Sequence, residues 1–383
     1  MRRARPVLLG AALALAGCEN EPPAVSTHVD DWRDRVVYQI VVDRFANGDP
    51  SNDSADGVDV DPSDLSRAQG GDWRGVTERL DYVARLGMSA IWISPVTANI
   101  ARTESEDGYH GYWPSDFTVH NPRFGSIEDL RELVGEAHAR DLAVIVDIVP
   151  NHAGRVFAYD LDGDAEVDHP VEDLPPYRAE GGYDAPLLWY ARPRLRGADG
   201  EPFELGAEHF RRRGIGDLGD FEQRRLGDFP TGLRDLDTER EDVIAGLIET
   251  YVRWVLDTDV DGFRIDAVPH VELPFWQRFC HAIRERLAAS GKQRFFLLGE
   301  IFETDPVELA RHTSERALDA GFDFPLQYGL IDQVILGGGA PELARASLEA
   351  ARGAYRDEPQ PLGIGLDPWQ ARIASTVKIA TSA

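Results

Sequence analysis

The chain has 383 residues and carries 40 Lys and Arg against 67 Asp and Glu, a formal net charge of -27. Such an acidic surface repels nucleic acids and anionic membranes, which excludes both as electrostatic partners. The length suits one large domain or two ordinary ones, and a hydrophobic content of 43% suffices for a buried core. Two cysteines are too few for a disulfide framework.

The N-terminal residues have the composition of an export signal followed by a tether. Three arginines among the first five residues precede an apolar stretch over 7–16. The stretch ends in Leu-Ala-Gly-Cys, which resembles the cleavage site of bacterial lipoproteins. We expect residues 1–17 to be removed, Cys18 to be lipidated, and residues 18–29 to tether an exported protein to the bacterial cell envelope or release it outside the cell. An ordinary signal peptide with an incidental cysteine is the alternative.

From residue 30 on, short β-branched runs alternate with helix-patterned stretches, which predicts βα units and a parallel sheet. The expected strands are 36–42, 90–94, 143–149, 262–268, 295–299 and 318–322. The expected helices are 76–86, 127–140, 240–256, 274–289, 326–335 and 341–355. Residues 153–232 interrupt the alternation, are rich in Gly, Pro, Asp and Arg, and are too many for a loop. A small inserted domain is expected there, between the main-domain segments 30–152 and 233–383.

Polar clusters close three of the expected strands, at residues 147–152, 261–270 and 299–302. Ligands of parallel α/β folds bind at the carboxyl ends of the strands, so these clusters are expected to form one site. Structural ion pairs or strand-end turns would explain any one cluster alone. Three clusters in chain order favour a functional site.

The second and third clusters hold two carboxylates in different surroundings. Arg264 and Asp266 are two residues apart and share one face of a strand. An arginine beside a carboxylate lowers its pKa and keeps it ionised, as a nucleophile requires. Glu300 follows an apolar run, so desolvation is expected to raise its pKa, as a general acid requires. Glycosidases use such a pair of carboxylates as their catalytic groups.

The three motifs resemble those of the α-amylase family, glycoside hydrolase family 13, over about residues 31–325. The resemblance implies an α/β fold, a (β/α)8 TIM barrel with a domain B, residues 153–232, inserted after the third strand. It implies retaining hydrolysis of α-1,4-glucosidic bonds in starch and maltooligosaccharides. By the same resemblance Asp266 is the nucleophile, Glu300 the acid/base, and Arg264 the support of Asp266.

The resemblance also implies substrate-binding residues. Asp147 would be a structural partner at the barrel mouth, and His152 a donor to the sugar at the cleavage point. Residues 109–113 match a further family segment, in which Tyr112 stacks on a sugar ring and His110 lies close by. An aromatic face complements the apolar face of a pyranose. A half-buried structural tyrosine is the alternative.

Two calcium sites follow from the same resemblance. The common site of the family would take a side-chain oxygen of Asn151, a carboxylate of Asp235 and the backbone carbonyl of His270, all hard oxygen ligands. The second resembles the extra site of cyclodextrin glucanotransferases and would use Asn47, Asp49, Asn52, Asp53, Gly70 and Asp72. A solvated turn is the usual meaning of such composition. The acidic run 160–164 is expected to be a solvated loop.

Two departures from the family pattern affect the expected activity. Pro269 stands where the family has Lys or Arg, so one contact on the leaving-group side is lost or relocated. No His-Asp pair follows Glu300, although the family carries one at the end of its seventh strand. A seventh strand would begin near residue 361. We therefore expect a barrel truncated after about six strands and weak or absent activity.

Three functional interpretations stay open. The favoured one is an envelope-tethered α-glucan hydrolase. A glucanotransferase or cyclomaltodextrinase-like enzyme would use the same site and would convert maltoheptaose into longer oligomers. An inactive glycan-binding lipoprotein would bind maltooligosaccharides without turnover. In each case we expect a monomer that contacts the membrane through its lipid alone.

Overall fold

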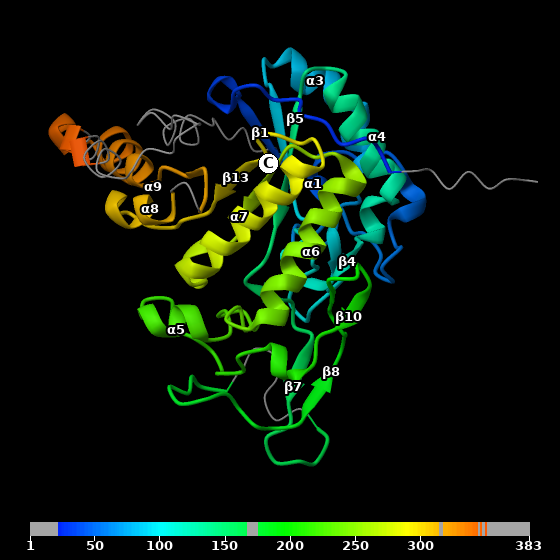
Figure 1. Cartoon of the computed structure of the whole chain (residues 1–383), viewed down its shortest axis with the longest axis vertical. Helices are drawn as coiled ribbons and strands as arrows, with labels where there is room; N and C mark the ends of the chain where they lie inside the picture. Colours follow the sequence, from blue (N-terminus) through cyan, green and yellow to red (C-terminus); the bar gives the residue numbers. More distant parts are fainter. Residues whose placement is uncertain (1–21, 167–174, 314–316, 344, 347–348, 351–383) are drawn as a thin grey trace, which may run out of the picture.

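A computed structural model of the chain describes residues 22–350, apart from residues 167–174, 314–316, 344 and 347–348. The centre of the fold is a parallel sheet in the order β1-β2-β5-β12-β13-β14 (Figure 1). These strands are β1 (Val37–Ile40), β2 (Ala90–Ile93), β5 (Ala143–Ile148), β12 (Gly262–Ile265), β13 (Phe296–Gly299) and β14 (Ala320–Gly321). The six expected strands are confirmed, and spatial neighbours follow chain order, as in a βα repeat.

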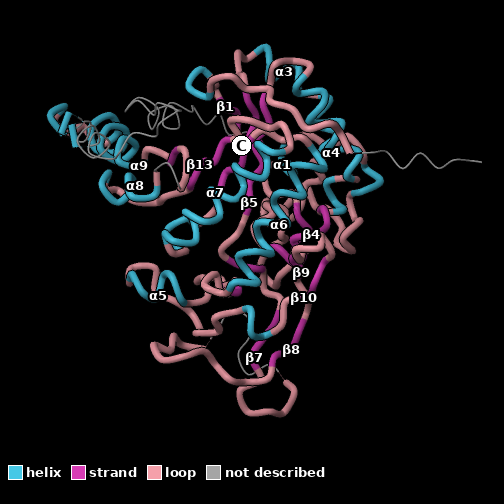
Figure 2. Tube along the Cα trace, viewed as in Figure 1, coloured by secondary structure: helices cyan, strands magenta, loops and turns pink. Residues whose placement is uncertain are grey.

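Helices connect successive strands and cover the outer face of the sheet (Figure 2). They include α2 (Trp73–Glu78), α3 (Leu80–Arg85), α4 (Ile127–His138), α6 (Glu241–Thr258), α7 (Leu273–Ala289) and α8 (Pro306–His312). A capping box starts α4, because Ser126 and Asp129 each accept a hydrogen bond from the backbone N–H of the other. The helix expected over 76–86 is instead two helices that meet at Arg79, whose backbone is not helical.

The two faces of the sheet bury different side chains. Residues such as Ile91, Val144 and Phe263 point outward into the large core under the helices. Trp92 and Ile145, one residue further along their strands, point to the inner face and form a separate cluster. This alternation follows from the period of two along a strand.

The sheet is curled. The ring of Trp92 on β2 lies 5.5 Å, centroid to centroid, from the ring of Phe322, which follows β14. On a flat sheet four strand spacings would separate β2 from β14 by about 19 Å. The curled parallel sheet is consistent with a (β/α)8 barrel, of which the described residues supply these six strands.

Two of the expected strands end earlier than predicted. β1 stops at Ile40, and the short helix α1 (Val42–Phe45) follows. β12 stops at Ile265, because Ala267 adopts a left-handed backbone with φ of 53° and a 3-10 turn over Val268–His270 follows. The expected strand extensions are therefore wrong, and the chain turns sharply where the polar clusters lie.

Short antiparallel pairs, which the sequence analysis missed, build the region below the sheet in Figure 1. They are β3 (Thr97–Asn99) with β4 (Pro114–His120), β6 (His152–Ala153) with β11 (Arg234–Asp235), β7 (Phe157–Tyr159) with β8 (Leu187–Trp189), and β9 (Arg194–Arg196) with β10 (Pro202–Glu204). All of these strands except β4 have only two or three residues, which carry too little alternation to be recognised. The β6–β11 pair brings the two ends of the segment 153–232 together.

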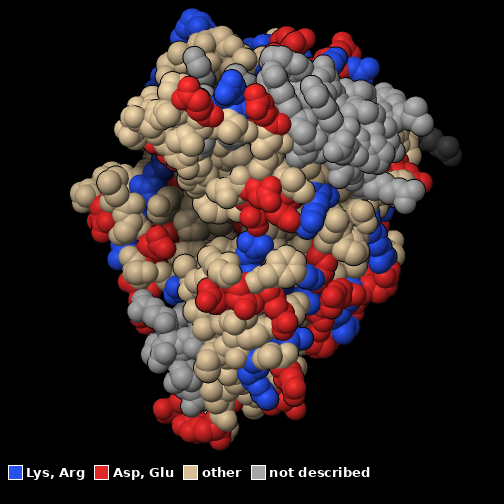
Figure 3. Space-filling model, turned by 90° about the vertical axis from the view of Figure 1, so that its left-hand side faces the viewer, with Lys and Arg blue, Asp and Glu red and all other residues tan. Residues whose placement is uncertain are grey.

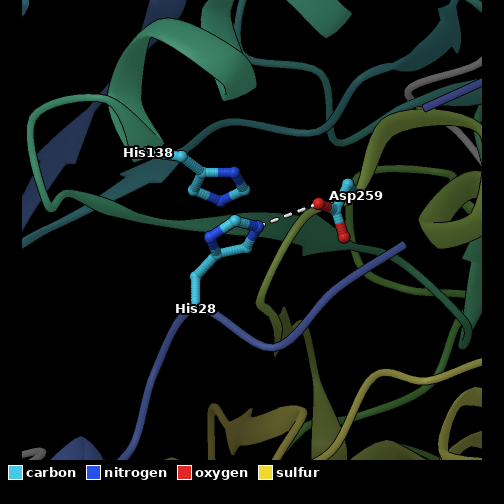
Figure 4. A group of neighbouring side chains, drawn as sticks. All are labelled: His28, His138 and Asp259. Atoms are coloured by element: carbon cyan, nitrogen blue, oxygen red, sulfur yellow. Dashed lines mark hydrogen bonds and ion pairs between the residues drawn. The ribbon is translucent and has the colours of Figure 1, made fainter. Parts of the chain in front are cut away.

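The N-terminal segment lies against the amino ends of the strands (Figure 4). Ser26 donates its backbone N–H to Asp259, at 2.9 Å, in the turn that precedes β12. The His28 ring stacks on His138 with centroids 3.5 Å apart, and its Nε2 lies 3.0 Å from Asp259 Oδ2. Trp32 donates to the backbone carbonyl of Arg294. The last residues of the expected tether thus contact the barrel.

The last described residues are helical. α9 (Phe324–Leu326) continues into wider helical turns over Gln327–Leu336, where a helix was expected. Helical turns follow between residues 341 and 350, and the rest of the helix expected to residue 355 lies outside the described residues. So does the seventh strand expected near residue 361. Within the described part of the chain, no helix combines the length and hydropathy that a membrane span needs.

Candidate active site

The carboxyl ends of β5, β12 and β13 bring the expected catalytic residues together. Strand register explains this, because Arg264 pairs with Asp147 of β5 and with Leu298 of β13. Asp266 follows Arg264 by two residues, and Glu300 follows Leu298 by two residues. Both are therefore expected on the face of the sheet that carries Arg264. The surface in Figure 3 is hollowed, with acidic and basic side chains near the recess.

Arg264 is the hub of the site and is 4% exposed. Its Nη1 lies 2.9 and 3.1 Å from the two carboxylate oxygens of Asp147. The same nitrogen lies 2.8 Å from Asp266 Oδ1, while Nη2 lies 2.8 Å from Glu300 Oε1. One guanidinium therefore neutralises parts of three carboxylates and fixes their relative positions.

Asp147 is completely buried and accepts hydrogen bonds from three side chains. Besides Arg264, the Tyr112 hydroxyl donates at 2.7 Å and the Trp92 indole N–H at 3.0 Å, both to Oδ2. Burial raises the pKa of the Asp147 carboxyl to about 7, while Arg264 and Tyr112 oppose that rise. The donors around Asp147 are thus what allows it to hold a negative charge inside the protein.

Glu300 has the surroundings of a general acid. Burial is the main cause that raises the pKa of its carboxyl, Arg264 lowers it, and a hydrogen bond with Asp266 raises it again. The backbone N–H of Ala267, a residue with a left-handed backbone, donates to Glu300 Oε2 at 3.2 Å. Glu300 and Asp266 thus contact the same arginine from different surroundings, and their catalytic roles stay predictions.

The expected sugar-binding residues surround this hub. Tyr112 is half-buried, with its hydroxyl on Asp147 and its ring over Arg264, 5.7 Å from the guanidinium carbon. The His110 ring stacks on Tyr112 at 5.7 Å, and His152 Nε2 contacts the Tyr112 carbonyl at 3.1 Å. Burial lowers the pKa of both histidines to about 4, so they are neutral at pH 7. Their roles toward a sugar stay predictions.

Two of the three residues expected at the common calcium site, Asn151 and Asp235, are in contact. Asn151 Nδ2 contacts Asp235 Oδ1 at 2.9 Å. The other oxygen of Asp235 is buried without a hydrogen bond, 3.1 Å from Arg211 Nε. Burial raises the pKa of Asp235 well above its usual value. His270 lies on the neighbouring turn, in ring contact with Phe229 at 4.9 Å.

The six residues expected at the second calcium site converge from two loops. Asp53 Oδ1 accepts from Asn47 Nδ2 at 2.7 Å, and a Cβ on Gly70 would collide with both. Asp72 accepts from the backbone N–H of Gly48 and of Asp49, and from Asn52 Nδ2 at 3.4 Å. Asn52 Oδ1 is buried without a hydrogen-bond partner.

Two further groups of side chains have metal-ligating types. Asp160, Asp162 and Asp164 gather at one loop, and Asp160 already accepts from two backbone N–H groups of that loop. His28, His138 and Asp259 form the second group. Their imidazole rings are nearly parallel, at 20°, so no ion can lie in both ring planes, where the nitrogen lone pairs point. This second group stabilises the N-terminal segment instead.

Trp92 is the site residue that the sequence analysis did not single out. Its alternation with the outward-facing Ile91 and Ile93 places it inside the sheet. A buried indole needs an acceptor for its N–H, and that requirement is the signal which would have pointed to Asp147.

Comparisons with known proteins agree with this geometry. The family described as the catalytic domain of alpha amylase matches residues 39–350. An alpha-amylase of Streptomyces lividans is 34% identical over 308 residues, which are 74% of this chain and 33% of that protein. The crystal structure of the Geobacillus thermoleovorans alpha-amylase with acarbose superposes with a TM-score of 0.60 at 31% identity, over 86% of this chain and 60% of that one.

A cyclomaltodextrin glucanotransferase with a three-domain ABC distribution, CldA, superposes with a TM-score of 0.66 at 26% identity. That match covers 84% of this chain and 62% of the glucanotransferase. The chain thus spans a third of the Streptomyces relative and about three fifths of the two solved structures.

Replacing Arg264 by Met is expected to destabilise the fold by about 3–5 kcal/mol at about pH 8, because it leaves buried carboxylates without their counter-charge. Burial raises the folded-state pKa of Asp147 and Glu300, so the folded state holds protons that the unfolded state releases, and stability falls as pH rises. The cost is therefore expected to be smaller at about pH 5. Urea unfolding at both pH values measures it.

The double variant with Asp147→Asn is the matched control for Arg264→Met. It removes the most buried of the three carboxylates and is expected to regain much of the free energy of unfolding that Arg264→Met loses at about pH 8. If Arg264→Met destabilised the fold equally at both pH values, Arg264 would not be the counter-charge of these carboxylates.

Proposed function

The chain belongs to the α-amylase family, and on this premise we propose that it is a retaining glycoside hydrolase acting on α-1,4-linked glucans such as starch and maltooligosaccharides. The observation that carries the proposal is the placement of Asp266 and Glu300 on the two terminal nitrogens of Arg264. Family membership supports the proposed substrate class, and the geometry supports the proposed roles.

The proposed reaction has two steps. Glu300, whose pKa burial raises, gives a proton to the glycosidic oxygen while Asp266 attacks the anomeric carbon. Glu300 then removes a proton from water, which releases the sugar from Asp266 with net retention. Asp266 and Glu300 each lie 2.8 Å from a terminal nitrogen of the same guanidinium, and this closeness supports retention, since inversion needs carboxyl groups about 6.5–9.5 Å apart to hold a water.

We propose that residues 153–232 are the domain B of this family and form the wall of the cleft opposite the sheet. Arg224, on the short helix α5 (Phe221–Leu226), forms an ion pair of 3.0 Å with Glu303, three residues beyond Glu300. The segment therefore contacts the loop that carries the proposed acid. This contact supports the proposal that the segment borders a bound glucan.

Transfer to a second sugar is the alternative reaction, and one surface feature favours it. Phe302 is 60% exposed two residues after Glu300, and its ring lies 4.9 Å from Phe324 and 6.2 Å from Tyr328. An aromatic rim of this kind can hold an acceptor sugar. Products longer than the maltoheptaose supplied would identify transfer, whereas shorter products alone identify hydrolysis.

Asp266→Asn is expected to abolish turnover of both maltoheptaose and α-maltosyl fluoride, because it removes the nucleophile. Glu300→Gln is expected to lose maltoheptaose cleavage by about 10²–10⁴-fold. With the fluoride it is expected to keep the first step, release of fluoride ion, because fluoride leaves without protonation, whereas the second step slows because its base is gone. Fluoride release and the proton NMR signal of the first-formed anomer are the measurements. A β anomer as first product, or full activity of Asp266→Asn, would overturn the proposal.

We propose that calcium binds at both loop sites: at the second site the buried Asn52 oxygen has no hydrogen-bond partner, and at the common site the buried Asp235 carboxylate has an oxygen with no hydrogen bond, although Arg211 is paired with it at 3.1 Å. At the common site a neutral His152 can donate from one nitrogen only, yet its two nitrogens contact the Tyr112 carbonyl and the Asn151 oxygen. Rotating the Asn151 amide relieves this conflict and turns its oxygen toward Asp235, where a cation would join the two. The ions would hold loops in place and take no part in bond breaking.

Added calcium is therefore expected to raise the melting temperature and a chelator to lower it. Asp53→Asn, which keeps a hydrogen-bonding side chain but removes the charge, is expected to reduce the calcium shift. Asp61→Asn, in a similar exposed turn that caps Ser63, is the control and should keep the full shift. Calcium shifts unchanged in Asp53→Asn and in Asp235→Asn would contradict both sites.

We propose that Cys18 is lipidated and anchors the protein to the bacterial cell envelope. Residues 26–32 reach the fold at the amino ends of the strands, whereas the proposed active site lies at the carboxyl ends. The described part of the N-terminal segment therefore contacts the fold on the side away from the cleft, which is compatible with an anchor that leaves the cleft free for a polymer. No other contact with lipid is proposed.

Labelling with a radioactive fatty acid in a bacterial host is expected to mark the wild-type chain and not Cys18→Ser. Cys280→Ser is the control, because Cys280 is fully buried in α7 and should not affect labelling. Label retained in Cys18→Ser would refute the anchor.

A further inference from the structure

The indole of Trp92 contacts both members of the ion pair at the centre of the site. Its Nε1–H donates to Asp147 Oδ2 at 3.0 Å, and its ring lies 5.2 Å from the Arg264 guanidinium carbon. Trp92 and Asp147 are 4% and 1% exposed, so water cannot replace either contact. A single side chain thus supplies a hydrogen bond to the anion and an aromatic face to the cation.

The position of Trp92 also separates the site from the inside of the curled sheet. Its far side contacts the ring of Phe322 at 5.5 Å and belongs to the apolar cluster that includes Ile145. Below the Asp147–Arg264 pair the interior is therefore apolar. A carboxylate at such a boundary depends on each of its hydrogen-bond donors, because the apolar side chains offer no other donor.

We propose that Trp92 is a positioning residue of this site, whose indole N–H keeps Asp147 ionised and thereby holds Arg264 in contact with Asp266 and Glu300. The inference deepens the proposed glycosidase function and rests on it for the catalytic measurement alone. The contact with Asp147 exists whatever reaction the site performs, so a second measurement tests it without turnover.

Charged and titratable groups face Asp147 from every element around it. Arg264 and Asp266 come from the end of β12, Tyr112 from the loop before β4, and Tyr251 from α6. Of the groups that donate to Asp147, Trp92 is neutral and cannot titrate. Removing its N–H therefore changes the proton affinity of Asp147 without adding or removing a charge, and it favours the protonated, neutral carboxyl.

The test compares Trp92→Phe with Trp254→Phe. Trp254 is also a buried tryptophan, and its indole N–H donates at 2.8 Å to the backbone carbonyl of Phe117, away from any carboxylate. Each variant loses one indole hydrogen bond and keeps an aromatic ring. Any difference between them in pH dependence therefore comes from the acceptor, a carboxylate in one case and a carbonyl in the other.

In Trp92→Phe the decrease of kcat/KM for maltoheptaose at acidic pH is expected to begin about one pH unit higher than in the wild-type chain. At a given pH within that decrease, kcat/KM is then about tenfold lower. Activity at the alkaline end should change much less, and Trp254→Phe should leave the decrease in place. An unmoved decrease in Trp92→Phe would overturn the positioning role. If the wild-type chain cleaves no α-glucan, the proposed function fails and the next measurement decides the role of Trp92.

That measurement is the free energy of unfolding by urea as a function of pH. The folded-state pKa of Asp147 is raised by burial, so stability falls as pH rises toward that pKa, and a further rise in Trp92→Phe extends the fall to higher pH. The destabilisation by Trp92→Phe should therefore grow between about pH 5 and about pH 9, while that by Trp254→Phe stays constant. A constant cost in both variants would overturn the inference. Trp92→Met repeats the comparison if Trp92→Phe does not fold.

Discussion

A single buried guanidinium holds the site of this protein together. Arg264 contacts Asp147, Asp266 and Glu300 at 2.8 to 3.1 Å, and each of these carboxylates closes a different strand of the same sheet. Without the arginine, three negative groups would repel one another in a region of low dielectric constant. The arrangement of strand ends and the chemistry of the site therefore depend on the same charge.

The surroundings of the three carboxylates divide their roles. Asp147 has no exposure and takes donors from three directions, which suits a fixed structural anion. Glu300 is desolvated but keeps an exposed side, with one oxygen on Arg264, which suits a group that gives and takes a proton. One arginine can serve all three because its donors lie in a rigid plane.

Much of the catalytic core could be predicted because it rests on local patterns. The six strands, their order and the polar residues after β5, β12 and β13 all follow from alternation and from strand-end chemistry. The pieces that escaped prediction are short or depend on distant partners. Strands of two or three residues such as β6 and β11 exist only because each pairs with the other, and the break at Arg79 depends on packing.

Sequence alone determined which residues are available to the site, because a period of two and a run of apolar residues are properties of neighbouring positions. That Arg264 and Asp266 share a face needed no structure. The curl of the sheet was decided only by tertiary structure, since it depends on the register and twist of all six strands together. The curl brings Trp92 of β2 beneath Arg264 of β12 and against Phe322 beyond β14, and so completes the surroundings of Asp147.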